Sequence, residues 1–127
     1  MNRYLLLVLI IFIYIAGCQS SGDLNKEDLS AAKIFQKAYE ASDSQNYSLA
    51  LQYYSIYQER FPDDRDGNIW ALYEIAFLYH KMGNEEKATQ LFEELIDKYQ
   101  GNETEEFPQA PLVLAQKVIT NINEENN

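Results

Sequence analysis

Apolar side chains recur every three or four residues along most of the chain after residue 25, which is the period of an amphipathic helix. Polar, turn-forming stretches interrupt this pattern and divide it into five segments. The pattern predicts helices over residues 26–43, 46–61, 68–82, 85–99 and 109–123. We therefore expect an all-α domain over residues 26–123, with neighbouring helices antiparallel and a frayed tail at residues 124–127.

The helical pattern also repeats along the chain. A unit of about 38 residues, seen twice, indicates a helix pair that cannot bury its apolar face alone and stacks on its neighbour. The fifth helix places Ala115 where a third unit would begin, so we expect it to cap the second pair. The residues that match at an interval of 38 are Ala38 and Ala76, Ala50 and Ala88, Tyr54 and Phe92, Tyr57 and Leu95, and Phe61 and Tyr99.

The second unit, residues 69–100, resembles the tetratricopeptide repeat. The closing proline of that family is Gln100 here, whereas Pro62 occupies the place in the first unit, where Lys37 and Ala41 depart from the pattern. The resemblance implies two helix pairs plus a C-terminal capping helix, forming a short α-solenoid. The residues that carry it are Leu72, Ile75, Ala76, Tyr79, Gly83, Ala88, Phe92 and Leu95.

An apolar run precedes the helices and ends in Ile15-Ala16-Gly17-Cys18, which resembles the lipobox of bacterial lipoproteins. As a helix, residues 5–16 would reach only about 18 Å, short of the roughly 30 Å hydrocarbon core of a bilayer. We therefore expect residues 1–17 to be a signal segment. The resemblance implies a covalent lipid on Cys18 and a tether over residues 18–25. The alternatives are an ordinary signal peptide and an uncleaved anchor.

The net charge of the chain limits the classes of partner that it can bind. Acidic side chains outnumber basic ones by 20 to 10, and the net charge is −10. This sign disfavours nucleic acid and charge-driven docking on anionic membranes, so attachment to a membrane must come from the lipid. Cys18 is the only cysteine, which excludes a disulfide within the chain. In enteric-type sorting an aspartate after the lipidated cysteine retains a lipoprotein at the inner membrane. Gln19 therefore favours the periplasmic face of the outer membrane.

In the tetratricopeptide family, the first helix of each pair lines a concave groove. A spacing of three and four residues places the rings at these positions on one stripe, and aromatic side chains commonly anchor partner peptides. We expect Trp70 and Tyr73 to be partly exposed there; the alternative is that Trp70 and Phe77 pack against neighbouring helices. The groove positions are Trp70, Tyr73, Phe77, His80 and Lys81 in the second unit, and Ala32, Phe35, Tyr39, Ser42 and Asp43 in the first.

The chain offers little catalytic chemistry. His80 is the only histidine, which excludes a histidine dyad and a multi-histidine metal site. The acidic run at residues 63–67 fails as a calcium loop, because its first ligand would be Pro62 and its twelfth Tyr73 instead of glutamate. Phosphate-loop, GxSxG and HExxH motifs are absent from the sequence. We expect no enzyme activity, no metal and no cofactor apart from the lipid on Cys18.

Together these features predict a membrane-anchored adaptor that binds a protein or peptide partner at the bacterial cell envelope. Its layout resembles that of lipoproteins that assist outer-membrane protein assembly and of periplasmic repeat proteins of the Tol system. The alternatives are an accessory subunit of a periplasmic substrate-binding transporter and a small-ligand-binding lipoprotein, which a deep polar pocket would favour. Two units are fewer than the roughly three that a stable stack needs, so the fifth helix or self-association must complete it.

Lipidation can be tested directly at Cys18. Mass spectrometry of protein extracted from membranes is expected to show a chain that starts at a lipid-modified Cys18. Each buried methylene contributes about 0.8 kcal/mol, so two or three acyl chains give stable attachment. The Cys18→Ala variant is expected to remain an unprocessed precursor, and normal processing of that variant would contradict the lipobox interpretation.

Overall fold

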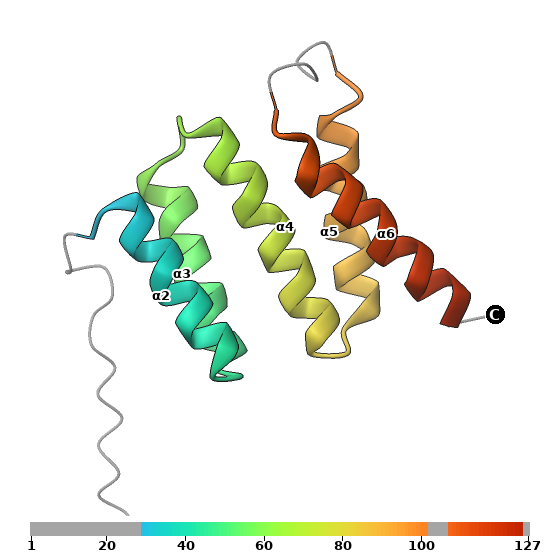
Figure 1. The fold of residues 1–127 in the computed structure, drawn as a ribbon, viewed down its shortest axis with the longest axis horizontal. Coiled ribbons are helices and arrows are strands. Elements are labelled where there is room, and N and C mark those ends of the chain that lie inside the picture. The colour runs from blue at the N-terminus through green and yellow to red at the C-terminus, as the bar shows by residue number, and fades with distance from the viewer. Residues whose placement is uncertain (1–28, 102–106, 126–127) are drawn as a thin grey trace, which may run out of the picture.

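The computed structural model describes residues 29–101 and 107–125, and this part of the chain is built from α-helices without any strand (Figure 1). Successive helices lie side by side and reverse direction at each turn. The predicted all-α architecture, a short solenoid of two helix pairs and a fifth helix, is confirmed. The helices are α2 (Ala31–Asp43), α3 (Tyr47–Arg60), α4 (Arg65–Lys81), α5 (Glu85–Lys98) and α6 (Gln109–Glu125).

Three predicted boundaries were wrong by two residues or more, in two cases because a capping side chain sets the helix start, and the others agree to within one residue. The first helix begins at Ala31 because Ser30 is extended and its hydroxyl accepts the backbone N–H of Lys33. The third begins at Arg65, since Asp64 caps it in the same way. The last continues to Glu125, so residues 124–125 of the predicted frayed tail are helical. Residues 26–28 and 126–127 lie outside the described part.

The predicted signal segment, Cys18 and the tether all precede residue 29 and lie outside the described residues. Among the helices between residues 29 and 125 that are described, none combines the length and apolarity needed to cross a bilayer.

α4 is the central helix and packs into two apolar clusters. Ala71 and Leu78 belong to the cluster formed with α2 and α3. Leu72 and Ala76 belong to the cluster formed with α5 and with Ala115 of α6. Figure 1 accordingly shows α4 between the α2–α3 pair and the α5–α6 side. A helix that is apolar on most of its circumference is expected in such a buried position.

The repeat register is visible in the small residues between paired helices. Ala38, Ala50, Ala76 and Ala88 are completely buried, which lets the helix backbones approach closely. Gly83 ends the first helix of the second unit with a φ of 74°, a conformation that favours glycine. The position 38 residues earlier is Gln45, which adopts a φ of 59°. The two units therefore use the same turn, although only one of them has the glycine.

The fifth helix, α6, caps the second unit with one of its faces and leaves the other face exposed. Ala115 and Ile122 of α6 are buried, and α6 packs on both α4 and α5. Val113, by contrast, is 60% exposed, and Leu114 is also exposed. α6 thus closes the second apolar cluster and keeps part of its own apolar surface in solvent.

Hydrogen bonds to the side chain of Asp64 stabilise the turn between α3 and α4, which joins the two units. The hydroxyl of Tyr57 donates to Oδ2 at 2.5 Å, and the backbone N–H of Gly67 donates to Oδ1 at 2.9 Å. Asn68 donates its amide to the backbone oxygens of Phe61 and Asp64, at 2.7 and 2.8 Å. The acidic run at residues 63–67, which fails as a calcium loop, therefore contains the capped start of α4.

Gly67→Ala is expected to lower the free energy of unfolding by about 1–3 kcal/mol, the usual cost of overpacking. A Cβ at this position would lie 1.8 Å from the Tyr57 hydroxyl and 2.7 Å from the ring carbon that bears it. Adding Tyr57→Phe should therefore recover part of the loss. Urea denaturation measures both variants. Gly101→Ala is the matched control, because its Cβ would meet nothing nearer than 4.0 Å. Equal stability of Gly67→Ala and Gly101→Ala would contradict this account.

Asp64 should also make stability depend on pH. Its hydrogen bonds, first from Tyr57 and then from the Gly67 N–H, lower its pKa in the folded state. The folded carboxylate therefore holds its proton less tightly than the unfolded one, and its contribution is present above pH about 3.9 and lost as pH falls further. Asp64→Ala should cost about 1 kcal/mol at pH 7, and this difference should shrink in acid. Thermal melts between pH 7 and pH 2 test it; a constant difference would count against it.

Candidate partner-binding groove

The first helices of the two units, α2 and α4, meet through a hydrogen bond that spans 35 positions of sequence. The hydroxyl of Tyr39 on α2 donates to Oε1 of Glu74 on α4 at 2.9 Å. This contact joins α2 to α4 at one point, although α4 packs mainly on α3 and α5. The predicted groove residues of both units therefore come from neighbouring helices.

On α2, Tyr39 is the aromatic residue that solvent can reach. Its side chain is 45% exposed. Phe35, one turn earlier, is half-buried, and its ring lies 5.4 Å from Tyr54 and 4.5 Å from Tyr57, both on α3 and both in edge-to-face geometry. The other predicted positions follow the same gradient, since Ala32 and Asp43 are exposed and Ser42 is half-buried.

On α4, the expected exposure of Tyr73 was wrong. Its side chain is only 7% exposed and belongs to the second apolar cluster. The ring stacks on Phe77 at 5.9 Å with an interplanar angle of 12°, and it also contacts Phe92 of α5 at 5.8 Å. The physical reason is that its ring packs among Trp70, Phe77 and Phe92, between α4 and α5. Tyr73 is therefore a core residue.

Trp70 and Phe77 combine the two roles between which the sequence left a choice. Both pack against the second cluster, and both are only half-buried. Trp70 meets Tyr73 edge-on at 6.1 Å. Each side chain therefore has one part in the core and another part that a partner can reach.

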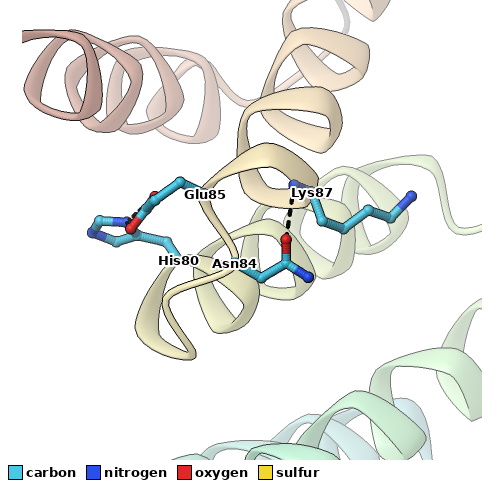
Figure 2. Close-up of polar contacts among 4 residues, drawn as sticks. All are labelled: His80, Asn84, Glu85 and Lys87. Atoms are coloured by element: carbon cyan, nitrogen blue, oxygen red, sulfur yellow. Dashed lines mark hydrogen bonds and ion pairs between the residues drawn. The ribbon is translucent and has the colours of Figure 1, made fainter. Parts of the chain in front are cut away.

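His80 and Lys81, at the end of α4, are engaged within the molecule. His80 Nδ1 lies 2.8 Å from Oε2 of Glu85, so the ring ties the end of α4 to the start of α5 (Figure 2). Asn84 caps α5 in the same turn by accepting the N–H of Lys87 (Figure 2). Lys81 is exposed, and its Nζ stands 5.1 Å above the ring of Phe77 and 6.0 Å from that of Tyr47.

Glu74 is the groove residue that the sequence analysis missed. Its side chain is half-buried, and this burial raises its pKa, while the hydrogen bond from Tyr39 and the charge of Lys81 act in the opposite direction. Burial and the neighbouring Glu74 raise the pKa of Tyr39 to about 12. Glu74 lies outside the groove positions of the family. The sequence did contain a signal for Glu74. It follows Trp70 by four residues and precedes Phe77 by three, and this spacing places all three on one face of a helix.

A separate cleft of about 380 Å³ lies between the two units, near the start of α4. None of its lining residues belongs to the predicted groove. Arg65 at its edge stands 4.9 Å over the ring of Phe107. Within residues 29–101 and 107–125, no three His, Cys, Asp or Glu side chains gather as a metal site would require. The cleft is lined by Gln58, Pro62, Arg65, Asn68, Ile69, Leu72, Glu94, Lys98 and Phe107.

Comparison with known proteins agrees with this geometry. Residues 70–102 match the family model of the tetratricopeptide repeat. The chain is also similar to proteins named outer membrane protein assembly factor BamD. It is 28% identical over 96 residues to the one from Neisseria meningitidis serogroup A / serotype 4A, and 28% identical over 91 residues to that of serogroup B. The protein of Neisseria gonorrhoeae is 28% identical over 96 residues.

These alignments cover most of this chain and a minority of each relative. They include 72%, 68% and 72% of this chain, and 36%, 34% and 36% of the three relatives in the same order. The chain thus spans about a third of the length of the curated relatives it matches. No solved structure gives a significant match. The chain therefore contains a tetratricopeptide repeat at residues 70–102, set within a short all-α solenoid.

Proposed function

We propose that this chain is an adaptor of the bacterial cell envelope that holds a protein partner during outer-membrane assembly. The observation that carries the proposal is the similarity of 72% of the chain to a protein named as an outer-membrane protein assembly factor. The similarity includes a tetratricopeptide repeat, an architecture suited to binding an extended segment along the first helices of its pairs. In this chain those helices are α2 and α4.

Attachment to the membrane is part of the proposal. A lipid on Cys18 would hold the domain at the periplasmic face of the outer membrane, where an assembly adaptor has to work. The net charge of −10 supports this division of labour, because an acidic domain gains nothing by docking directly on anionic lipid. The lipid supplies the attachment, and the helical domain remains available to its partner.

The groove supports binding rather than catalysis. Tyr39, Trp70 and Phe77 present rings that are exposed or half-buried, as partner-anchoring residues usually are. His80, the only histidine, is already bonded to Glu85. We therefore propose a scaffold without enzyme activity, whose function is to position a partner.

The groove can be tested by changing exposed residues and keeping the core intact. Tyr39→Ala and Trp70→Ala should abolish capture of the partner, because aromatic anchors carry much of the energy of an interface. Tyr39→Ala should lower the free energy of unfolding by only about 0.5–1.5 kcal/mol, the usual worth of the hydrogen bond to Glu74 that it loses, because the side chain is 45% exposed. Capture is measured by crosslinking in native membranes and identification of the bound proteins by mass spectrometry.

Val113→Ala is the matched control, because it removes an exposed apolar side chain from α6, outside the groove. Tyr73→Ala serves as the opposite control and should lower the free energy of unfolding by about 3–5 kcal/mol, as truncation of a core aromatic does. Partners of outer-membrane assembly that bind the parent and Val113→Ala, and are lost from Tyr39→Ala, would support the proposal. Undiminished capture by both groove variants, or bound proteins unrelated to the outer membrane, would exclude it.

A further inference from the structure

Glu74 is a half-buried carboxylate without an ion-pair partner in the described part of the chain. Its one hydrogen bond there is the neutral contact from Tyr39, which uses Oε1. Lys81 acts on it only through space, because its Nζ is placed over the rings of Phe77 and Tyr47. A charged group that loses solvent without gaining a counter-charge raises the free energy of the folded state. A cation that arrives with a partner would remove that cost.

A second polar group beside Glu74 also lacks a well-formed hydrogen bond. Tyr54 on α3 is 1% exposed, and its hydroxyl makes no hydrogen bond of normal geometry to a described residue, although it interacts with the hydroxyl of Tyr39. Burial, then the charge of Glu74, then Tyr39 raise the pKa of Tyr54, so the three groups lie close together. The rings of Tyr39 and Tyr54 meet edge-on at 6.4 Å. Of the three residues, Tyr39 is the exposed one, and its ring contacts that of Tyr54.

The chemistry of this cluster selects for a guanidinium group. Glu74 offers a second carboxylate oxygen, and Tyr54 offers a phenolic oxygen without a donor in normal geometry. A guanidinium carries five N–H donors in a planar fork, stacks on aromatic rings and loses its hydration more readily than an ammonium. A lysine ammonium could pair with Glu74, but it lacks the flat face that the Tyr39 ring can cover.

The net charge of the chain is complementary to a cation. α2 itself is balanced, with Lys33 and Lys37 against Glu40 and Asp43, so the attraction comes from Glu74 and from the net charge of −10 of the whole chain. An acidic protein attracts a basic segment and repels an acidic one, which contributes both to the rate of association and to specificity.

We propose that Glu74, together with the rings of Tyr39 and Tyr54, binds an arginine side chain of the segment held between α2 and α4. This inference rests on the proposed function, because it assigns the chemistry of the partner at the same groove. Tyr39 shifts aside or stacks on the guanidinium, Glu74 accepts its N–H groups, and the Tyr54 hydroxyl gains a donor.

The test uses the full chain in detergent micelles and two short peptides, acetyl-Phe-Arg-Phe-amide and acetyl-Phe-citrulline-Phe-amide. Citrulline has nearly the shape of arginine and no charge, so the difference in affinity isolates the ion pair. Trp70 is the only tryptophan of the chain and precedes Glu74 by one helical turn, so its fluorescence reports binding at this place. The arginine peptide should bind about tenfold more tightly, the factor expected for one charge-assisted hydrogen-bonded pair.

Glu74→Gln should make the two peptides bind equally, because the amide keeps the shape and the hydrogen bond from Tyr39 but loses the charge. Glu93→Gln removes the same charge from an exposed site on α5 and should keep the preference. Equal binding of both peptides to the parent, a preference retained in Glu74→Gln, an equal loss in Glu93→Gln, or no binding at millimolar peptide would each overturn the arginine site. Partner capture from membranes is a separate measurement. If it persists while the preference is absent, the arginine site fails and the adaptor function stands.

Discussion

The burial of α4 on both sides is the contact on which the rest of the structure depends. Each helix pair has only one apolar face to offer, and a pair of this size cannot form a separate core. α4 solves this by giving Ala71 and Leu78 to the first cluster and Leu72, Tyr73 and Ala76 to the second. α4 is therefore the helix that the two clusters share, and neither cluster would be stable without its side chains.

The same arrangement brings residues of the two units together. Since α2 and α4 both pack into the first apolar cluster, Tyr39 and Glu74 come within hydrogen-bonding distance although they are far apart in sequence. α5 and α6 pack on the other side of α4, where the Tyr73 ring contacts Phe92 and belongs to the second apolar cluster. What remains accessible is a surface of mixed character, with an exposed tyrosine, half-buried aromatic rings and a half-buried carboxylate that makes no ion pair among the described residues. A surface of this kind is suited to an extended segment that brings both an apolar and a basic side chain.

Polar groups in this protein fall into two kinds. Some close turns within the chain, and others keep hydrogen-bonding capacity that the fold does not use. Around Asp64, every hydrogen bond closes a turn within the chain, and the carboxylate is satisfied by Tyr57 and Gly67. Around Glu74, the carboxylate has one neutral partner, and the hydroxyl of Tyr54 has none in normal geometry among the described residues. A fully satisfied network stabilises the fold. An incompletely satisfied network can instead form new hydrogen bonds with a partner, and these lower the free energy of the complex.

For the described residues, the sequence by itself determined the number of helices, the order of the pairs and the positions of close backbone contact, because helical periodicity and the spacing of Ala38, Ala50, Ala76 and Ala88 are local properties. It did not determine helix starts to the residue, since Ser30 and Asp64 act through cap geometry that periodicity does not contain. Only the tertiary structure decided that Tyr73 is core and that Glu74 faces Tyr39. Both depend on which neighbouring helix covers which edge of α4, and this is settled by packing between segments far apart in the chain.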